Sequence, residues 1–125
     1  MIVLDTHAWI WWAAERSKLS STARAAVDGA DSVGVSAISC WEVAMLVKKN
    51  RLQLDRKTLV WINQALDLPK VVLLPLTPNI AVASAEIAQR DPADRIIAAT
   101  ALSHRAALVT KDRRLWQLDE PQTIW

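Results

Sequence analysis

Four short runs of strand character, separated by segments of helical character, restrict the folds open to this chain. The runs cover residues 1–4, 32–36, 70–76 and 107–110. Short, mostly apolar runs of this kind are typical of strands buried on both faces of a parallel sheet. Parallel strands need long connections, which are usually helices. The sequence therefore predicts an α/β fold in which helices cover both faces of a mostly parallel sheet, and it leaves the strand order open.

Helices are predicted between these strands, mostly from apolar spacing and from residues suited to their ends. Asp55 is expected to cap one helix, and Asp91 is expected to cap another in which Pro92 takes the first helical position. The expected helices cover residues 7–14, 20 or 21 to 27, 37–47, 56–66, 77 to about 90, and 92–102. The tail, residues 115–125, is expected to form a short edge strand.

Composition limits the class of protein. The chain has 125 residues, of which 52% are hydrophobic and 22% charged, and no Gly-, Ser- or Pro-rich linker interrupts it, so a single domain over residues 1–125 is expected. A net charge of +2 permits a nucleic-acid partner without requiring one. The lone Cys40 excludes an internal disulfide, and neither a secretory leader nor an apolar run of membrane-spanning length is visible. The cytoplasm is therefore the expected compartment.

Four acidic residues have positions that an α/β fold would bring to one edge of the sheet. Asp5 and Asp112 each follow a strand, Glu42 lies on the helix after the second strand, and Asp94 lies in the first turn of the helix before the fourth strand. Open α/β sheets bind ligands in the crevice beyond the carboxyl ends of their strands. The four carboxylates are therefore predicted to face one crevice.

Each of these residues also has a purely structural interpretation. Asp5 suits a helix cap, Glu42 suits a capping box with Ser39, Asp94 suits the positive end of a helix dipole, and Asp112 suits a loop. Taken together, however, four close carboxylates repel one another unless a divalent cation neutralises them. Oxygen ligands favour Mg²⁺, for which Mn²⁺ can substitute, and such sites catalyse phosphoryl transfer to water.

The residues around these acids resemble a known family. Leu4-Asp5-Thr6, the helix start from Ser36 to Glu42, Asp94-Arg95-Ile96-Ile97-Ala98-Ala99 and Leu108-Val109-Thr110-Lys111-Asp112 resemble the successive acidic motifs of PIN-domain ribonucleases. Within that family the likeness is to the VapC-type toxins of toxin–antitoxin pairs. The resemblance extends from Met1 to Asp112, and it includes all four acidic positions.

The resemblance implies a three-layer α/β/α domain with four to five strands and a Mg²⁺-dependent endoribonuclease activity. It implies that the metal-binding residues are Asp5, Glu42, Asp94 and Asp112, supported through hydrogen bonds by two hydroxyl residues, Thr6 and Thr110. It further implies a homodimer and a small antitoxin whose tail covers the active site.

Residues beside the acids are candidates for contact with RNA. Arg95, Lys111 and Arg113 adjoin acidic residues and are expected to contact phosphates. The chain also has seven tryptophans and no other aromatic residue apart from its histidines. Three of them are candidates for stacking an unpaired base or anchoring a partner, namely Trp11, Trp61 and Trp116. Three others are expected in the core or in subunit contacts, namely Trp9, Trp12 and Trp41.

Alternative functions remain open at this point. A housekeeping RNA-processing nuclease would carry the same motifs, and a non-catalytic binding protein would keep the fold but lack metal-dependent cleavage. A phosphorylation-receiver module would need an acidic pair after the first strand and an Asp after the third, whereas Asp5 stands alone and the third strand ends at Leu76-Thr77. A haloacid-dehalogenase-type phosphatase would need a second Asp where this chain has His7.

Overall fold

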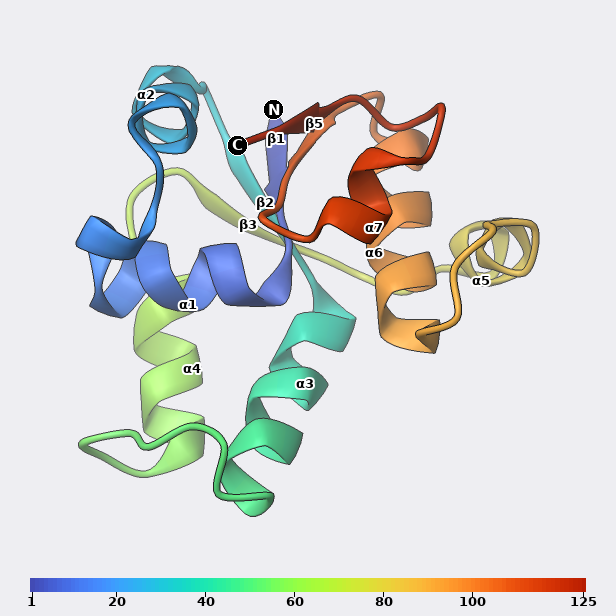
Figure 1. The fold of residues 1–125 in the computed structure, drawn as a ribbon. Helices are drawn as coiled ribbons and strands as arrows, with labels where there is room; N and C mark the ends of the chain where they lie inside the picture. Colours follow the sequence, from blue (N-terminus) through green and yellow to red (C-terminus); the bar gives the residue numbers. More distant parts are fainter.

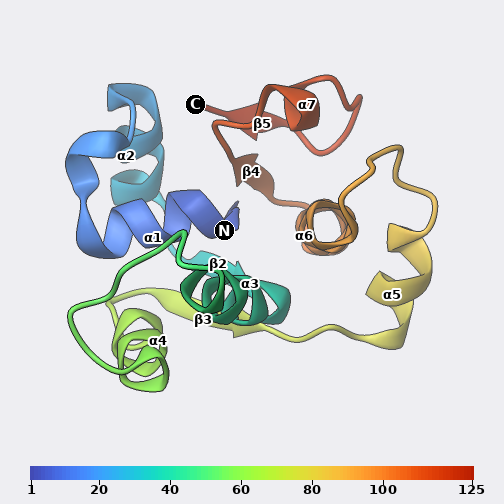
Figure 2. The ribbon, with the colours of Figure 1, turned by 60° about the horizontal axis from the view of Figure 1, so that its bottom comes forward.

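The computed structural model describes residues 1–125 as a parallel sheet between two helical layers (Figures 1 and 2). The strands are β1 (Ile2–Leu4), β2 (Val33–Ser36), β3 (Val71–Leu74), β4 (Ala107–Val109) and β5 (Thr123–Ile124). The helices are α1 (Thr6–Ala14), α2 (Ser21–Gly29), α3 (Ala37–Lys48), α4 (Thr58–Leu66), α5 (Pro78–Ser84), α6 (Pro92–Ser103) and α7 (Arg113–Trp116), with one 3₁₀ turn, η1 (Arg16–Lys18). None of these helices has the length and apolar character needed to cross a membrane.

All strand pairs are parallel, and the order across the sheet is β3-β2-β1-β4-β5. This confirms the predicted parallel sheet and the predicted short edge strand in the tail, which is β5. The order differs from the 2-1-3-4-5 order of phosphorylation-receiver folds, so that alternative is wrong. The chain adds strands on one side of β1 and then returns to add β4 on its other side. The carboxyl ends of β1 and β4 therefore form the topological switch point, where α/β folds bind their ligands.

Neighbouring residues of the central strands point to opposite faces and build two cores. Leu4 and Val109 pack with buried residues of α1, α2 and α4 on one face. Val3 and Leu108 pack with residues of α6 and α7 on the other face. Figure 2 shows these two helical layers on opposite sides of the sheet, with α5 outside α6. The predicted three-layer arrangement is therefore confirmed.

Helix α3 lies outside this simple layering and shapes the switch point. It begins directly after β2 and continues beyond the carboxyl ends of the strands (Figure 1). There it contacts α1, α4 and α6, so it joins the two helical layers at the edge of the sheet. Because Glu42 lies midway along α3, this placement brings its carboxylate toward the ends of β1 and β4.

One predicted helix boundary is wrong. The helix expected to run to about residue 90 is α5, which ends at Ser84. The Ser84 hydroxyl donates to the carbonyl of Ala81 (2.7 Å), and the backbone continues in short-range turns instead of helical hydrogen bonds. The resulting connection leads to Asp91, which precedes Pro92 and adopts an extended conformation before α6 begins.

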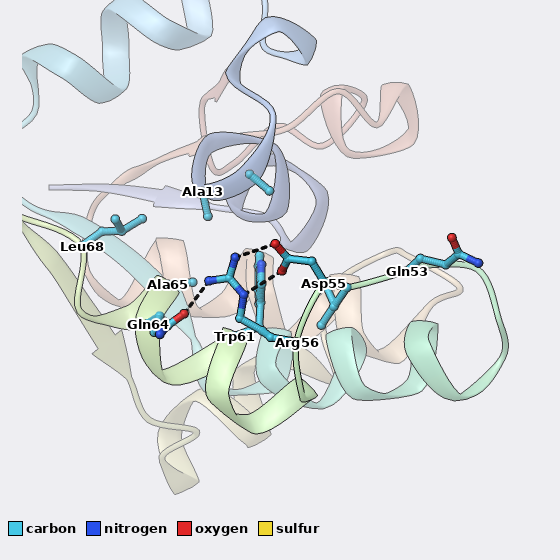
Figure 3. Close-up of a pocket in the computed structure, with 10 residues that line it drawn as sticks. Ala13, Gln53, Asp55, Arg56, Trp61, Gln64, Ala65 and Leu68 are labelled. Atoms are coloured by element: carbon cyan, nitrogen blue, oxygen red, sulfur yellow. Dashed lines mark hydrogen bonds and ion pairs between the residues drawn. The ribbon is translucent and has the colours of Figure 1, made fainter.

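The predicted cap of α4 is also wrong. The residue at the cap position is Lys57, and no side chain donates or accepts a capping bond there. Asp55 instead pairs with its neighbour Arg56 (2.7 Å between Asp55 Oδ1 and Arg56 Nε), whose guanidinium also donates to Gln64 (2.5 Å). Figure 3 shows this pair beside a pocket of about 410 Å³ between α1 and α4. The charges in this pocket are already paired with each other, which makes it a weak candidate for a reaction centre.

Candidate active site

A polar pocket of about 570 Å³ lies at the switch point between β1 and β4. All four predicted acidic residues line it: Asp5, Glu42, Asp94 and Asp112. A fifth carboxylate, that of Asp91, lines it as well. The other lining residues are Thr6, His7, Trp11, Lys111, Arg113 and Arg114. The structure thus brings together acids from four separate parts of the chain.

Asp5 is both a helix cap and a wall of the pocket. Its Oδ1 atom accepts a hydrogen bond from the Ala8 amide (2.8 Å), which caps α1, and its Oδ2 atom accepts one from the Thr110 hydroxyl (2.5 Å). Only 8% of the residue is exposed. Burial raises the pKa of Asp5, although the bonds from Thr110 and Ala8 oppose that rise. Asp5 therefore caps α1 and lines the pocket at the same time.

Glu42 is held in place by a chain of hydroxyl groups. Its Oε1 atom accepts a hydrogen bond from Thr6 Oγ1 (2.5 Å), and Thr6 Oγ1 also lies 2.9 Å from the buried Ser39 hydroxyl. Burial raises the pKa of Glu42, and the bond from Thr6 opposes that rise. The proposed capping box between Ser39 and Glu42 is wrong, because α3 begins earlier and its cap is Ser36.

Asp94 differs from the other acids because no side chain or backbone group donates a hydrogen bond to it. Burial, together with repulsion from Asp91, Glu42, Asp112 and Asp5, raises the pKa of Asp94 to about 7. Asp91 caps α6 by accepting from the Ala93 amide (2.8 Å). The sequence analysis identified only the capping role of Asp91. Its position one turn before Asp94, at the same end of α6, could have indicated that it also lines the pocket.

Asp112 is paired with the positively charged side chain of Arg114. It caps the short helix α7 by accepting from the Arg114 amide (2.9 Å), and the Arg114 guanidinium lies 3.3 Å from its carboxylate. Neither α7 nor the role of Arg114 was predicted. Beneath this turn, Thr110 Oγ1 accepts from the Asp112 amide (3.0 Å) while it donates to Asp5, so one hydroxyl joins the two strand ends.

We expect Thr110→Val to destabilise the protein by about 1–3 kcal/mol, because it leaves a buried Asp5 oxygen and the Asp112 amide without their partner. Thr100→Val is the matched control. Thr100 is equally buried, but its hydroxyl donates to the Ile96 carbonyl of its own helix, which has a helical hydrogen bond as well. Urea unfolding of both variants measures the difference. Equal losses would contradict the bridging role of Thr110.

The donor set of the pocket suits a hard divalent cation. Carboxylate oxygens are the ligands that Mg²⁺ and Mn²⁺ prefer, and the raised pKa of Asp94 shows what burying these acids together costs without a cation. No three of the acidic, histidine or cysteine side chains form a compact, ready-made metal cluster. Mg²⁺ usually keeps several of its waters, so it does not require such a cluster. The residues present therefore fit a hydrated divalent ion.

The predicted RNA-contacting residues fall into two groups. Lys111 and Arg113 line the acidic pocket, whereas Arg95 is not among its lining residues. Trp11 also lines the pocket, but Trp61 is only 5% exposed within the core, so its predicted role in stacking or anchoring is wrong. Trp41 is 55% exposed on α3, which excludes it from the core and leaves the subunit-contact prediction open.

Comparison with known sequences finds one family model and one relative that match nearly the whole chain. The family model described as the PIN domain matches residues 2–121. The chain is 40% identical over 129 residues to Ribonuclease VapC22 of Mycobacterium tuberculosis, an alignment that covers 99% of this chain and 98% of that protein.

Comparison with solved structures finds proteins that share the fold of this chain. A crystal structure of VapBC2 from Rickettsia felis bound to a DNA fragment from their promoter matches with a TM-score of 0.72 at 14% identity, covering 98% of this chain and 97% of that one. A toxin–antitoxin complex from Klebsiella pneumoniae matches with a TM-score of 0.68 at 19% identity, covering 100% and 97%. FitAcB from Neisseria gonorrhoeae matches with a TM-score of 0.57 at 26% identity, covering 90% and 88%.

Proposed function

The chain belongs to the PIN-domain family and, within it, to the VapC-type ribonucleases; from this premise we propose that it is a Mg²⁺-dependent endoribonuclease and the toxin of a toxin–antitoxin pair. The observation that carries the proposal is the meeting of Asp5, Glu42, Asp94 and Asp112 in one pocket at the switch point. The relative's name supports ribonuclease activity, and the acidic pocket supports metal-dependent hydrolysis of a phosphodiester bond.

Each group in the pocket has a role in this proposal. Asp5, Glu42, Asp94 and Asp112 hold the divalent ion, while Thr6 and Thr110 fix the orientations of Glu42 and Asp5 through their hydrogen bonds. The chemistry that such an ion supplies is activation of a water molecule and neutralisation of charge on the scissile phosphate. A cation held there would favour the ionised form of Asp94, since a nearby positive charge lowers a carboxyl pKa.

Basic residues on the rim of the pocket orient the RNA. Lys111 and Arg113 line the same pocket as the acids and are proposed to contact phosphates beside the cleaved bond. Arg95 lies outside the pocket lining and is assigned only to more distant phosphates. No side chain needs to act as a nucleophile, because the metal-assisted route uses water.

The partners proposed are a small antitoxin and a second copy of this chain. The antitoxin inhibits the enzyme by placing an Arg or Lys among the carboxylates, as Arg114 already does at Asp112. The homodimer covers exposed apolar side chains on the edge strand β3 and around α5, namely Val72, Leu73, Leu76 and Val82. The RNA substrate makes the cytoplasm the proposed compartment.

Purified protein incubated with single-stranded and looped RNAs tests the proposed activity. We expect internal cleavage with Mg²⁺ or Mn²⁺ and none with excess EDTA. Expression of the protein alone, followed by co-expression with the product of an adjacent small reading frame, then separates a toxin from a housekeeping nuclease. Cleavage that persists unchanged in EDTA would overturn the metal mechanism. Undisturbed growth at high expression across several hosts would favour the housekeeping alternative.

A further inference from the structure

An aromatic surface borders the acidic pocket, and the proposed hydrolysis does not use it. Trp11 is the single hydrophobic residue among those that line the pocket. On α1 it lies one turn after His7, and their ring centroids are 5.7 Å apart. The ring centroid of Trp125, at the end of the chain, lies 5.8 Å from that of Trp11. Trp11 thus has two aromatic neighbours where it lines a polar site.

The core holds this ring in position. Trp11 and Trp125 are both partly buried and pack against the core that α1, α2 and α4 share with the sheet. The Lys111 ammonium nitrogen lies 5.8 Å from the centroid of the Trp11 ring, although Lys111 itself is exposed. A packed aromatic ring with an exposed cation near its face is an arrangement found where proteins hold single-stranded nucleic acid.

We propose that Trp11, flanked by His7 and Trp125, stacks an unpaired nucleobase of the RNA next to the scissile phosphate, an inference that rests on the proposed function. The base replaces the Lys111 side chain on the ring, and the released ammonium pairs with a phosphate of the same strand. The base must be unpaired, because only an unstacked base offers its face to a side chain. Trp11 is therefore a positioning residue that selects single-stranded or looped RNA.

The surroundings of Trp11 favour a nucleotide over an apolar peptide segment. A hydrophobic anchor of a protein partner needs several apolar residues around it, whereas the rest of this lining consists of charged, hydroxyl and imidazole groups. Lys111 and Arg113 provide positive charge for phosphates, and the carboxylates mark the place of the cleaved bond. A base stacked on Trp11 would thus share one pocket with both of the groups that bind its own backbone.

The test compares two protein variants on two RNAs, in an Asp94→Asn background that prevents cleavage. The probes are a labelled oligouridylate and an oligomer of equal length whose bases are missing, so both carry the same phosphates. With Trp11 present, we expect the abasic oligomer to bind about 5- to 150-fold more weakly, the range for loss of one stacked base. Trp11→Leu should remove most of this difference, and Trp11→Phe, which keeps an aromatic face, should retain much of it.

Two controls separate stacking from structural damage. Trp41→Leu removes another exposed tryptophan, one that does not line the acidic pocket, and should leave the preference for bases intact. The salt dependence of binding should be unchanged in Trp11→Leu, because no charge is lost, and reduced in Lys111→Gln. Thermal melts of each variant establish that it is folded.

The outcomes distinguish this inference from the proposed function. If Trp11→Leu discriminates between the two RNAs as the parent does, or weakens both equally, the inference is overturned while the nuclease proposal stands. In the first case, the aromatic surface would belong to a protein partner. If the protein with Asp94 restored neither binds nor cleaves base-containing RNA with Mg²⁺, the proposed function fails and the inference falls with it.

Discussion

Asp94→Asn should lower the rate of Mg²⁺-dependent RNA cleavage by at least about 100-fold, since loss of a metal's outer-shell partner alone costs about 10- to 100-fold. Asp94 is the acid in the pocket that caps no helix and accepts no hydrogen bond, so the substitution removes charge without removing a structural contact. The side chain keeps its size. Initial cleavage rates at saturating Mg²⁺, with a thermal melt to establish folding, measure the effect.

Two further substitutions test whether the loss of activity is specific to Asp94. Asp91→Asn removes a charge from the same pocket but keeps the cap of α6, because Asn caps helices as well as Asp does. We expect a smaller loss of activity from it than from Asp94→Asn. Asp67→Asn changes an exposed acid at the end of α4, outside the pocket, and should leave the rate unchanged. Activity of Asp94→Asn equal to that of Asp67→Asn would remove Asp94 from the catalytic set.

Local sequence was enough to place Asp5 and Asp112 because their positions follow from strand ends, whereas Glu42 and Asp94 reach the pocket through the packing of α3 and α6. Asp5 directly follows β1, and Thr110 directly follows β4, two strands that pair with Leu4 opposite Val109. In a parallel sheet, residues after paired strand ends lie at one edge whatever the remaining topology. The order of the strands was not predictable in the same way, because it depends on which connections cross which face, and short apolar runs carry no such information.

The wrong prediction at Asp55 and the incomplete one at Asp112 arise where two local partners compete and only the tertiary structure decides between them. Asp55 can cap a helix or pair with Arg56, and the position of Gln64 on α4 gives Arg56 a second acceptor that favours the pair. Asp112 can face the pocket or pair with Arg114, and the turn into α7 allows both. Sequence patterns reveal the competing partners, but they do not show which partner the folded chain brings within hydrogen-bonding distance.

Capping a helix and lining the pocket are compatible in three of these acids. Asp5, Asp91 and Asp112 each accept from a backbone amide at a helix start and each line the pocket. Helix starts offer unpaired amides and positive potential, so acids gather there for reasons of folding before any metal is considered. A test that separates the two roles needs an acid without a capping bond, and Asp94 meets that requirement.

The stability of the metal-free protein should depend on pH through Asp94. Its pKa is raised from 3.8 to about 7 on folding, so the folded state keeps a proton that the unfolded state loses. The stabilising contribution is complete below about pH 4 and is lost as the pH rises through about 7. Between about pH 5 and 8 in EDTA, wild type should lose about 1–2 kcal/mol more than Asp94→Asn, once solvent screening of this partly exposed group is included. Asp5 and Glu42 are buried in both proteins, so the comparison isolates the charge of Asp94 together with its repulsion of these two neighbours.

Mg²⁺ should reverse this loss of stability in wild type, and it should stabilise Asp94→Asn much less. For an illustrative millimolar dissociation constant and ~10 mM ion, linkage gives roughly 1.4 kcal/mol, or about 4 to 6 °C in melting temperature for a domain of this size. At about pH 8, Asp94→Asn should therefore be at least as stable as wild type in EDTA, and it should lack much of the Mg²⁺-dependent increase.

A purely structural Asp94 predicts the opposite pattern, since losing its interaction with the dipole of α6 costs about 0.3–1 kcal/mol with or without Mg²⁺. Thermal melts of both proteins in EDTA and in Mg²⁺ at matched ionic strength decide between the two. An equal decrease in both buffers, with no Mg²⁺ effect on wild type, would mean that these carboxylates serve the helix starts and not a metal.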